Sequence, residues 1–149
     1  MDEQKPKTLV SVEENADVSR AVRQWLNTYP DKPLSKLDFE WLGEKSGLCI
    51  STIQAAYKTK QFIDGSYQAQ YQFKLIYRVP AKNADERMSA DEVLDAYGAW
   101  AEAHADSLTI ADGIRVRKVK RDTAAALFAR YEGDIEDHQI LLTLIYEVI

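Results

Sequence analysis

Fourteen residues, from Ser66 to Val79, alternate between two kinds of side chain. Aromatic and aliphatic residues occupy every second position: Tyr67, Ala69, Tyr71, Phe73, Leu75, Tyr77 and Val79. Because successive side chains of a β-strand point to opposite faces, the pattern predicts one long strand with an apolar face and a glutamine-rich face. At about 3.3 Å per residue this strand would reach roughly 45 Å. A domain of this length should be only about 38 Å across, so the strand must curve strongly or project beyond its own core.

The loop before this strand points toward self-association. Residues Leu48–Lys58 predict a partner strand, and Thr59–Gly65 predicts the tip of a β-hairpin between the two. Phe62 and Ile63 are apolar residues in this otherwise polar loop. We expect both to be exposed in the isolated subunit and covered in an assembly, because exposed apolar clusters mark interaction sites.

The chain has 149 residues, of which 46% are hydrophobic, and this suits one globular domain. We expect a mobile tail over residues 1–10 and a single domain over residues 11–149. The net charge of -5 argues against a protein that coats nucleic acid or an anionic membrane with its whole surface. Cys49 is the one cysteine, so no intrachain disulfide can form, which suits a reducing compartment.

The beginning of the chain is charged and lacks the apolar run of a signal peptide, and no segment has the 18 or more apolar residues of a membrane helix. The sequence therefore predicts synthesis in the cytoplasm and no membrane partner.

Two capping-box patterns predict two helices. Ser11 with Glu14 precedes one apolar stripe, and Ser89 with Glu92 precedes another, after a linker over Pro80–Met88. The first stripe consists of Val18, Ala21, Val22, Trp25, Leu26 and Tyr29, and the second of Val93, Ala96, Tyr97, Trp100 and His104.

The remaining apolar runs predict strands over Leu37–Trp41, Ile114–Lys120 and Ile140–Val148, besides the hairpin. Residues Ala124–Tyr131 suit either a helix or a strand, and we favour a strand that leads through a Glu132–Asp134 turn into the last one. The predicted order is α, β, β, β, α, β, β, β. The fold class is α+β: a mainly antiparallel, possibly mixed, sheet with two amphipathic helices packed on one face and a long projecting hairpin.

Catalytic motifs are weak in this sequence. Gly43–Ser46 resembles the end of a phosphate-binding loop, but Glu44 stands where a glycine is needed. His104 is interpreted as a packed amphipathic residue, and Cys49 and Ser51 lack a glycine-flanked elbow. The adjacent residues Glu136, Asp137 and His138 predict a solvated acidic turn rather than a metal site. We expect no enzymatic activity, no cofactor and no metal.

A basic cluster is the remaining candidate site. Five cations fall within seven residues: Arg115, Arg117, Lys118, Lys120 and Arg121. Strand alternation would send Arg115, Arg117 and Arg121 to one face and Lys118 and Lys120 to the other. The cluster suits a charged edge that resists aggregation, a contact with the acidic helix around Asp91 and Glu92 of a neighbouring subunit in a head-to-tail ring, or a contact with nucleic acid.

Three segments resemble the minor capsid or tail-terminator proteins of tailed phages and prophages of Gram-positive bacteria. They are Gly47–Tyr57, Lys60–Arg78 and Ala126–Val148, in the same order of helix, three strands, helix and strands. The resemblance implies a small α+β subunit without enzymatic activity that forms a hexameric ring in the virion, at the head-proximal end of the tail or in the neck. Such rings stop polymerisation of the tail tube and join the tail to the head.

The resemblance also implies partners. They are further copies of this chain, tail-tube and head-completion proteins, and DNA that passes through the ring lumen. No residue of the family has a motif distinct enough to be transferred to this sequence. The alternative function is a monomeric binding or regulatory module that contacts nucleic acid through the basic strand 115–121.

Overall fold

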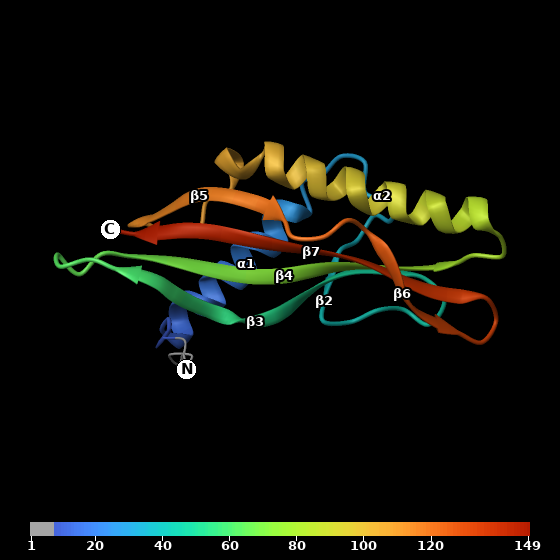
Figure 1. The fold of residues 1–149 in the computed structure, drawn as a ribbon, viewed down its shortest axis with the longest axis horizontal. Coiled ribbons are helices and arrows are strands. Elements are labelled where there is room, and N and C mark those ends of the chain that lie inside the picture. Colours follow the sequence, from blue (N-terminus) through green and yellow to red (C-terminus); the bar gives the residue numbers. More distant parts are fainter. Residues whose placement is uncertain (1–7) are drawn as a thin grey trace, which may run out of the picture.

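The computed structural model describes residues 8–149, which form two α-helices and a sheet (Figure 1). The helices are α1 (Val12–Leu26) and α2 (Ala84–Ala103), and α2 is followed by a 3-10 helix, η1 (Ala105–Ser107). The strands are β1 (Thr8–Leu9), β2 (Asp38–Phe39), β3 (Gly47–Gln61), β4 (Tyr67–Pro80), β5 (Ile114–Arg121), β6 (Ala126–Tyr131) and β7 (Ile135–Val148). The predicted α+β fold class is confirmed.

The sheet has seven strands in the order β1-β3-β4-β7-β5, with β2 added to β3 and β6 added to β7. The last strand, β7, therefore lies between β4 and β5. Within the described residues every pair of strands is antiparallel except β2 with β3. The expected mainly antiparallel sheet is thus a mixed one.

The long central strand β4 does not project alone. β7 pairs with it along its whole length, from Tyr67 opposite Val148 to Pro80 opposite Ile135. The sheet is elongated for this reason, and the β3–β4 hairpin extends past the end of β7 only at its tip (Figure 1). The predicted projection therefore applies to the loop, because the last strand is as long as β4, at 14 residues each.

The two faces of β4 differ as the alternation predicts. Its apolar face lies in the core beneath the helices, and its fully buried members are Ala69, Tyr71, Phe73 and Leu75. The other face carries Gln68, Gln70, Gln72 and Lys74, which are half-buried. In Figure 1, α1 crosses behind the sheet and α2 runs along its upper side.

Helix α1 begins where the sequence predicts. The Ser11 hydroxyl caps it by accepting a hydrogen bond from the backbone N–H of Glu14, at 3.1 Å. The Glu14 carboxylate does not complete the capping box. It instead accepts hydrogen bonds from the hydroxyls of Tyr67 on β4 and Tyr146 on β7. The predicted apolar face is buried in full: Val18, Ala21, Val22, Trp25, Leu26 and Tyr29.

Helix α2 begins earlier than predicted, because Asn83 rather than Ser89 is its N-cap. The Asn83 side chain accepts a hydrogen bond from the backbone N–H of Glu86, at 3.0 Å. The Glu86 carboxylate in turn accepts from the backbone N–H of Lys82, at 2.7 Å. Residues 84–88, predicted as part of a linker, are therefore helical.

The buried face of α2 is rotated relative to the prediction. It consists of Ala90, Leu94, Tyr97, Gly98 and Ala101. Ala96 and His104 are exposed, so their assignment to the apolar face is wrong. The reason is that Ala90 and Leu94, which the predicted stripe leaves out, are buried and place the stripe about one residue away from the predicted one. A Cβ atom on Gly98 would lie only 2.8 Å from Ile140 Cδ1, so glycine permits the close approach of α2 to β7.

Aromatic rings join the two helices. Trp25 and Trp100 have centroids 5.4 Å apart, and Tyr29 and Tyr97 have centroids 4.4 Å apart. The buried Tyr97 hydroxyl donates a hydrogen bond to the Leu26 carbonyl oxygen at 2.5 Å, at the end of α1. The same carbonyl also accepts from the Tyr29 N–H at 3.2 Å, so the bond adds a second donor at the helix end.

The predicted strand over Leu37–Trp41 is mostly wrong. Leu37 is buried, but β2 is two residues long, and Phe39 and Trp41 are 41% and 64% exposed. The strand ends because Glu40 adopts a φ of 56°, in the left-handed region. The Glu40 carboxylate accepts hydrogen bonds from the Ser51 hydroxyl (2.8 Å) and the Thr52 N–H (2.6 Å), on the edge of β3.

Two further predictions concern the hairpin at residues 124–131 and the tail at residues 1–10. The hairpin preferred for residues 124–131 is confirmed, since β6 pairs with β7 through a turn with Gly133 at a φ of 79°. The tail predicted over residues 1–10 lies outside the described residues as far as residue 7. Its last part is ordered, because Thr8 and Leu9 pair with Lys58 and Tyr57 of β3.

Candidate functional site

The tip of the β3–β4 hairpin is an exposed apolar point. The Phe62 and Ile63 residues are 50% and 108% exposed, as predicted. Two backbone hydrogen bonds shape the turn, from Phe62 N–H to the Ser66 carbonyl (2.9 Å) and from Gly65 N–H to the Phe62 carbonyl (3.1 Å). Gly65 has a φ of 92°, which a residue with a Cβ rarely adopts.

A carboxylate lies beside these two apolar side chains. Asp64 Oδ1 accepts hydrogen bonds from the hydroxyl (2.6 Å) and the backbone N–H (3.0 Å) of Ser66. These bonds lower the pKa of Asp64 below its usual 3.8, so the side chain is ionised at neutral pH. The tip therefore presents two apolar side chains together with a negative charge.

The basic cluster lies on β5 as expected, but its faces differ from the prediction. The pairing of β5 with β7 shifts between Val116 and Lys118. This bulge at Arg117 reverses the alternation, because it adds one residue to β5. Arg115, Lys118 and Lys120 stand opposite Glu147, Ile145 and Thr143, on the face away from the helices, and Arg121 stands opposite Leu142 of the core face.

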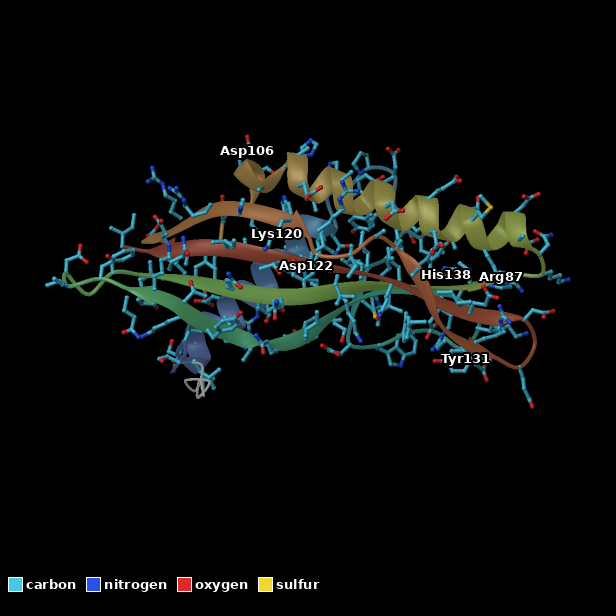
Figure 2. The ribbon with its side chains drawn as sticks, viewed as in Figure 1. Arg87, Asp106, Lys120, Asp122, Tyr131 and His138 are labelled. Atoms are coloured by element: carbon cyan, nitrogen blue, oxygen red, sulfur yellow. The ribbon has the colours of Figure 1, made fainter. Side chains whose placement is uncertain are left out.

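Several cations of the cluster already have partners within their own chain. Arg121 Nε lies 2.7 Å from Glu102 Oε1 on α2, and Arg117 Nε lies 3.6 Å from Glu147 Oε1. Lys120 lies close to Asp122 at the end of β5 (Figure 2), with 4.0 Å between Nζ and Oδ1. Arg115 and Lys118 have no ion pair among the described residues.

The two acidic residues predicted to meet this cluster across a subunit boundary lie on α2. Asp91 Oδ1 is 2.7 Å from His138 Nδ1 of its own chain. Glu92 is exposed, on the wall of a cavity of about 270 Å³ that also includes Asp31. A neighbouring subunit could therefore reach Glu92 freely, but it would have to compete with His138 for Asp91.

The segment predicted as a solvated acidic turn is instead a buried part of β7. Glu136, Asp137 and His138 are 0%, 2% and 0% exposed. The prediction is wrong because β7 begins at Ile135, so the turn ends before these residues. Glu136 and His138 share the helix-side face of the strand, and Asp137 points to the other face.

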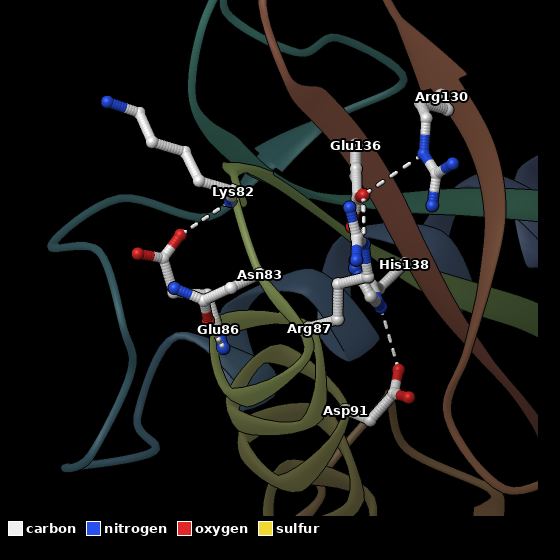
Figure 3. A network of polar contacts seen from close by, with 8 residues as sticks. All are labelled: Lys82, Asn83, Glu86, Arg87, Asp91, Arg130, Glu136 and His138. Atoms are coloured by element: carbon white, nitrogen blue, oxygen red, sulfur yellow. Dashed lines mark hydrogen bonds and ion pairs between the residues drawn. The ribbon is translucent and has the colours of Figure 1, made fainter.

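Figure 3 shows the polar network that Glu136 and His138 form beneath α2. Glu136 Oε2 accepts hydrogen bonds from Arg87 Nε (2.6 Å) and Arg130 Nε (3.2 Å). Glu136 Oε1 lies 3.2 Å from His138 Nε2, and Asp91 Oδ1 lies 2.7 Å from His138 Nδ1. A carboxylate only accepts hydrogen bonds, so both contacts of the imidazole are hydrogen bonds only when both ring nitrogens carry a proton.

The partners of Glu136 keep its carboxylate charged although it is buried. Burial alone would raise the pKa of Glu136, but hydrogen bonds from Arg87 and His138 and the positive charge of Arg130 hold it below its ordinary 4.5. The carboxylate is therefore ionised and joins α2, β6 and β7. In the sequence, this network is indicated only by the spacing of Glu136 and His138, which are two residues apart and so share one face of a strand.

A second ion pair fixes the opposite face. Arg78 on β4 binds Asp137 with Nε at 2.7 Å and Nη2 at 2.8 Å, and its Nη1 donates to the Gly43 carbonyl at 2.9 Å. The Tyr131 hydroxyl donates to Asp137 at 3.1 Å, and its ring lies beneath the guanidinium. The hydrogen bonds that Arg78 donates to Asp137 raise the pKa of Arg78. This arrangement anchors a loop and a hairpin to the sheet.

The candidate nucleophiles lie in settings that do not activate them. Burial, followed by the charge of Glu40, raises the pKa of the Cys49 thiol to about 11. The Ser51 hydroxyl donates to Glu40 at the sheet edge, with no histidine in that contact. Within residues 8–149, no group of three or more His, Cys, Asp or Glu side chains could hold a metal ion. The same residues include no helix long and apolar enough to cross a membrane.

In comparisons with known proteins, no family model matches this chain, and no curated protein matches it.

Proposed function

We propose that this protein is a structural subunit of a phage or prophage virion, which assembles into a ring at the tail or neck, terminates the tail tube and joins the tail to the head. The observation that carries the proposal is the apolar tip of the hairpin, with Ile63 fully exposed at the end of an elongated sheet. The resemblance of the strand and C-terminal segments to tail-terminator proteins adds to it. The proposed partners are other copies of this chain, tail-tube and head-completion proteins, and DNA in the lumen.

The energetics of the tip favour a partner. Burying a side chain such as Phe or Ile stabilises a contact by about 1.5–3 kcal/mol relative to leaving it in water. Because two hydrogen bonds already hold the backbone of this turn, binding needs to order only the two side chains. A ring would repeat this contact at each boundary between subunits.

The proposal is tested by the mass of the native particle, measured by light scattering at several concentrations. We expect a ring-sized species for the parent, and a monomer with unchanged circular dichroism for Phe62→Ser combined with Ile63→Ser. The control is Met88→Ser, because Met88 is also an exposed apolar residue, at 60%, but lies on α2. A parent that stays monomeric at high concentration, alone and with isolated tail tubes, would contradict the ring.

The second candidate is a monomeric binding or regulatory module that contacts nucleic acid through residues 115–121. It is favoured by the exposure of Arg115 and Lys118, which have no ion-pair partner among the described residues. Binding to phosphates would weaken steeply with salt. In this case Arg115→Glu with Lys118→Glu should abolish DNA retention in a gel-shift assay, whereas the ring subunit should show little retention with or without the change.

A further inference from the structure

A groove between α1 and β2 is suited to receive the hairpin tip of another subunit. Its volume is about 400 Å³, and it is lined by Ala16, Ser19, Arg20, Arg23 and Phe39. The four helical residues are spaced so that they form one stripe along α1. Phe39 faces them from β2, and 41% of its surface is exposed. It is the last residue of this two-residue strand, so no further residue of β2 packs beside it. The walls thus combine an aromatic ring with the aliphatic stems of two arginines.

One residue in the wall of the groove, Arg23, has a side-chain donor without an acceptor within residues 8–149. Arg23 Nε is buried, and it has no hydrogen-bond partner among the described residues. A buried donor without a partner is costly, so an incoming oxygen atom would be stabilised there. Arg20 is exposed one turn away and adds a second positive charge. A ligand for this groove should therefore carry an apolar group beside a carboxylate.

The hairpin tip has this chemistry. Phe62 and Ile63 are exposed apolar side chains, and Asp64 follows directly. Both hydrogen bonds from Ser66 go to Asp64 Oδ1, and the Asp64 side chain is exposed. The tip thus offers an apolar group together with an exposed carboxylate.

Four other cavities fit the tip less well. One, lined by Trp25, Gln24 and Thr109 among others, has no cation among its described lining residues to pair with Asp64. The other three are each lined by a carboxylate that would repel Asp64. These cavities contain Asp85 and Glu86, Glu40, and Asp31 with Glu92.

A subunit cannot fill its own groove. Phe39 pairs with Ile50, and the tip begins at Phe62, twelve residues beyond Ile50. Along a strand this separation is about 40 Å. The occupant must therefore come from a second copy of the chain. Because the tip and the groove are different surfaces, the contact runs head to tail, and such contacts generate rings when the rotation closes.

We infer that the Phe62–Asp64 tip of one subunit docks in the α1–β2 groove of the next, with its apolar side chains against Phe39 and its carboxylate toward Arg23. The inference rests on the proposed function, and it names the surface that receives the tip. The contact buries the exposed apolar tip and gives the buried Arg23 donor an acceptor. The ion pair between Asp64 of one subunit and the arginine of the next sets the orientation of the tip.

The test uses disulfide trapping in a Cys49→Ala background. One tagged chain carries Ile63→Cys and a second, differently tagged chain carries Ala16→Cys. We expect a mild oxidant to link the two chains at least tenfold faster than it links Ile63→Cys to Asp85→Cys, a control on an acidic cavity. We also expect Arg20→Glu with Arg23→Glu to remove this preference, and Asp64→Lys to restore it in part.

Equal linkage rates at Ala16 and Asp85 would overturn the docking site, and a ring-sized parent in the same samples would leave the proposed function standing. Selective linkage between chains that assemble no further than a dimer would support the docking site and contradict the ring. A monomeric parent without selective linkage would overturn both. A chain that carries both cysteines should give a ladder of linked multiples, because each subunit contributes one tip and one groove.

Discussion

Replacing Glu136 by glutamine should destabilise the fold through one buried carboxylate. Glutamine keeps the size of the side chain but removes the negative charge that faces Arg87, Arg130 and His138. His138 is fully buried between Glu136 and Asp91, so it cannot replace the lost contact with water. The amide nitrogen of glutamine is a hydrogen-bond donor, so it would also face an N–H donor of one of these three residues.

The magnitude follows from the exposure of each partner. A hydrogen bond to a charged group contributes about 1.5–3 kcal/mol when it is buried. The Arg130 side chain is 57% exposed and rehydrates easily, so its bond contributes little, and that of Arg87, at 33%, contributes partly. The short Arg87 bond and the fully buried His138 contact together contribute most. We therefore expect a loss of about 2–3 kcal/mol in the free energy of unfolding, less than the 3–5 kcal/mol of a fully buried pair.

Urea denaturation at fixed protein concentration measures this loss, with the fluorescence of Trp25 and Trp100 as the signal. At about 2–4 °C per kcal/mol, the thermal midpoint should fall by roughly 4–12 °C. Glu132→Gln is the matched control, because Glu132 lies exposed in the β6–β7 turn. A loss below about 0.5 kcal/mol for Glu136→Gln, or an equal loss in the control, would refute the argument that the network stabilises the fold.

The difference between parent and Glu136→Gln should also depend on pH. The pKa of Glu136 in the folded state lies below its ordinary 4.5, so the folded state favours the carboxylate. The stabilisation is present in full above pH 4.5, and it is lost as the pH falls through the lower folded value. A difference that persists unchanged to the most acidic pH at which the parent folds would show that charge is not its cause.

Three further predictions concern the core and the assembly. Tyr97→Phe should cost about 0.5–1.5 kcal/mol, measured by urea denaturation, because it removes a buried hydrogen bond while the Leu26 carbonyl keeps its bond from the Tyr29 N–H. Cys49 should react with a thiol reagent only on unfolding, since it is 2% exposed and its pKa is about 11; fast labelling of the folded protein would contradict this. Arg115→Glu with Arg117→Glu should weaken assembly at low salt, and Glu92→Lys should restore part of it. Unchanged light scattering of the double variant would remove β5 from the interface.

The sequence by itself determined the elements whose pattern is local. The alternation over Ser66–Val79 predicts β4, and the stripe that contains Trp25 predicts the buried face of α1, because each periodicity follows directly from backbone geometry. Capping follows the same local logic. It still gave the wrong start for α2, where Asn83 with Glu86 competes with the equally plausible Ser89 with Glu92.

Only the tertiary structure decided where the long strands find their partners. The insertion of β7 beside β4 buries Glu136 and His138, which polarity alone assigns to solvent. A bulge at Arg117 likewise exchanges the faces of β5 on which the following basic residues lie, and no pattern in the sequence predicts this bulge. The groove beside Phe39 exists because β2 ends at Phe39. Strand pairing, bulges and grooves depend on residues far apart in the chain, so their energies are settled only when those residues meet.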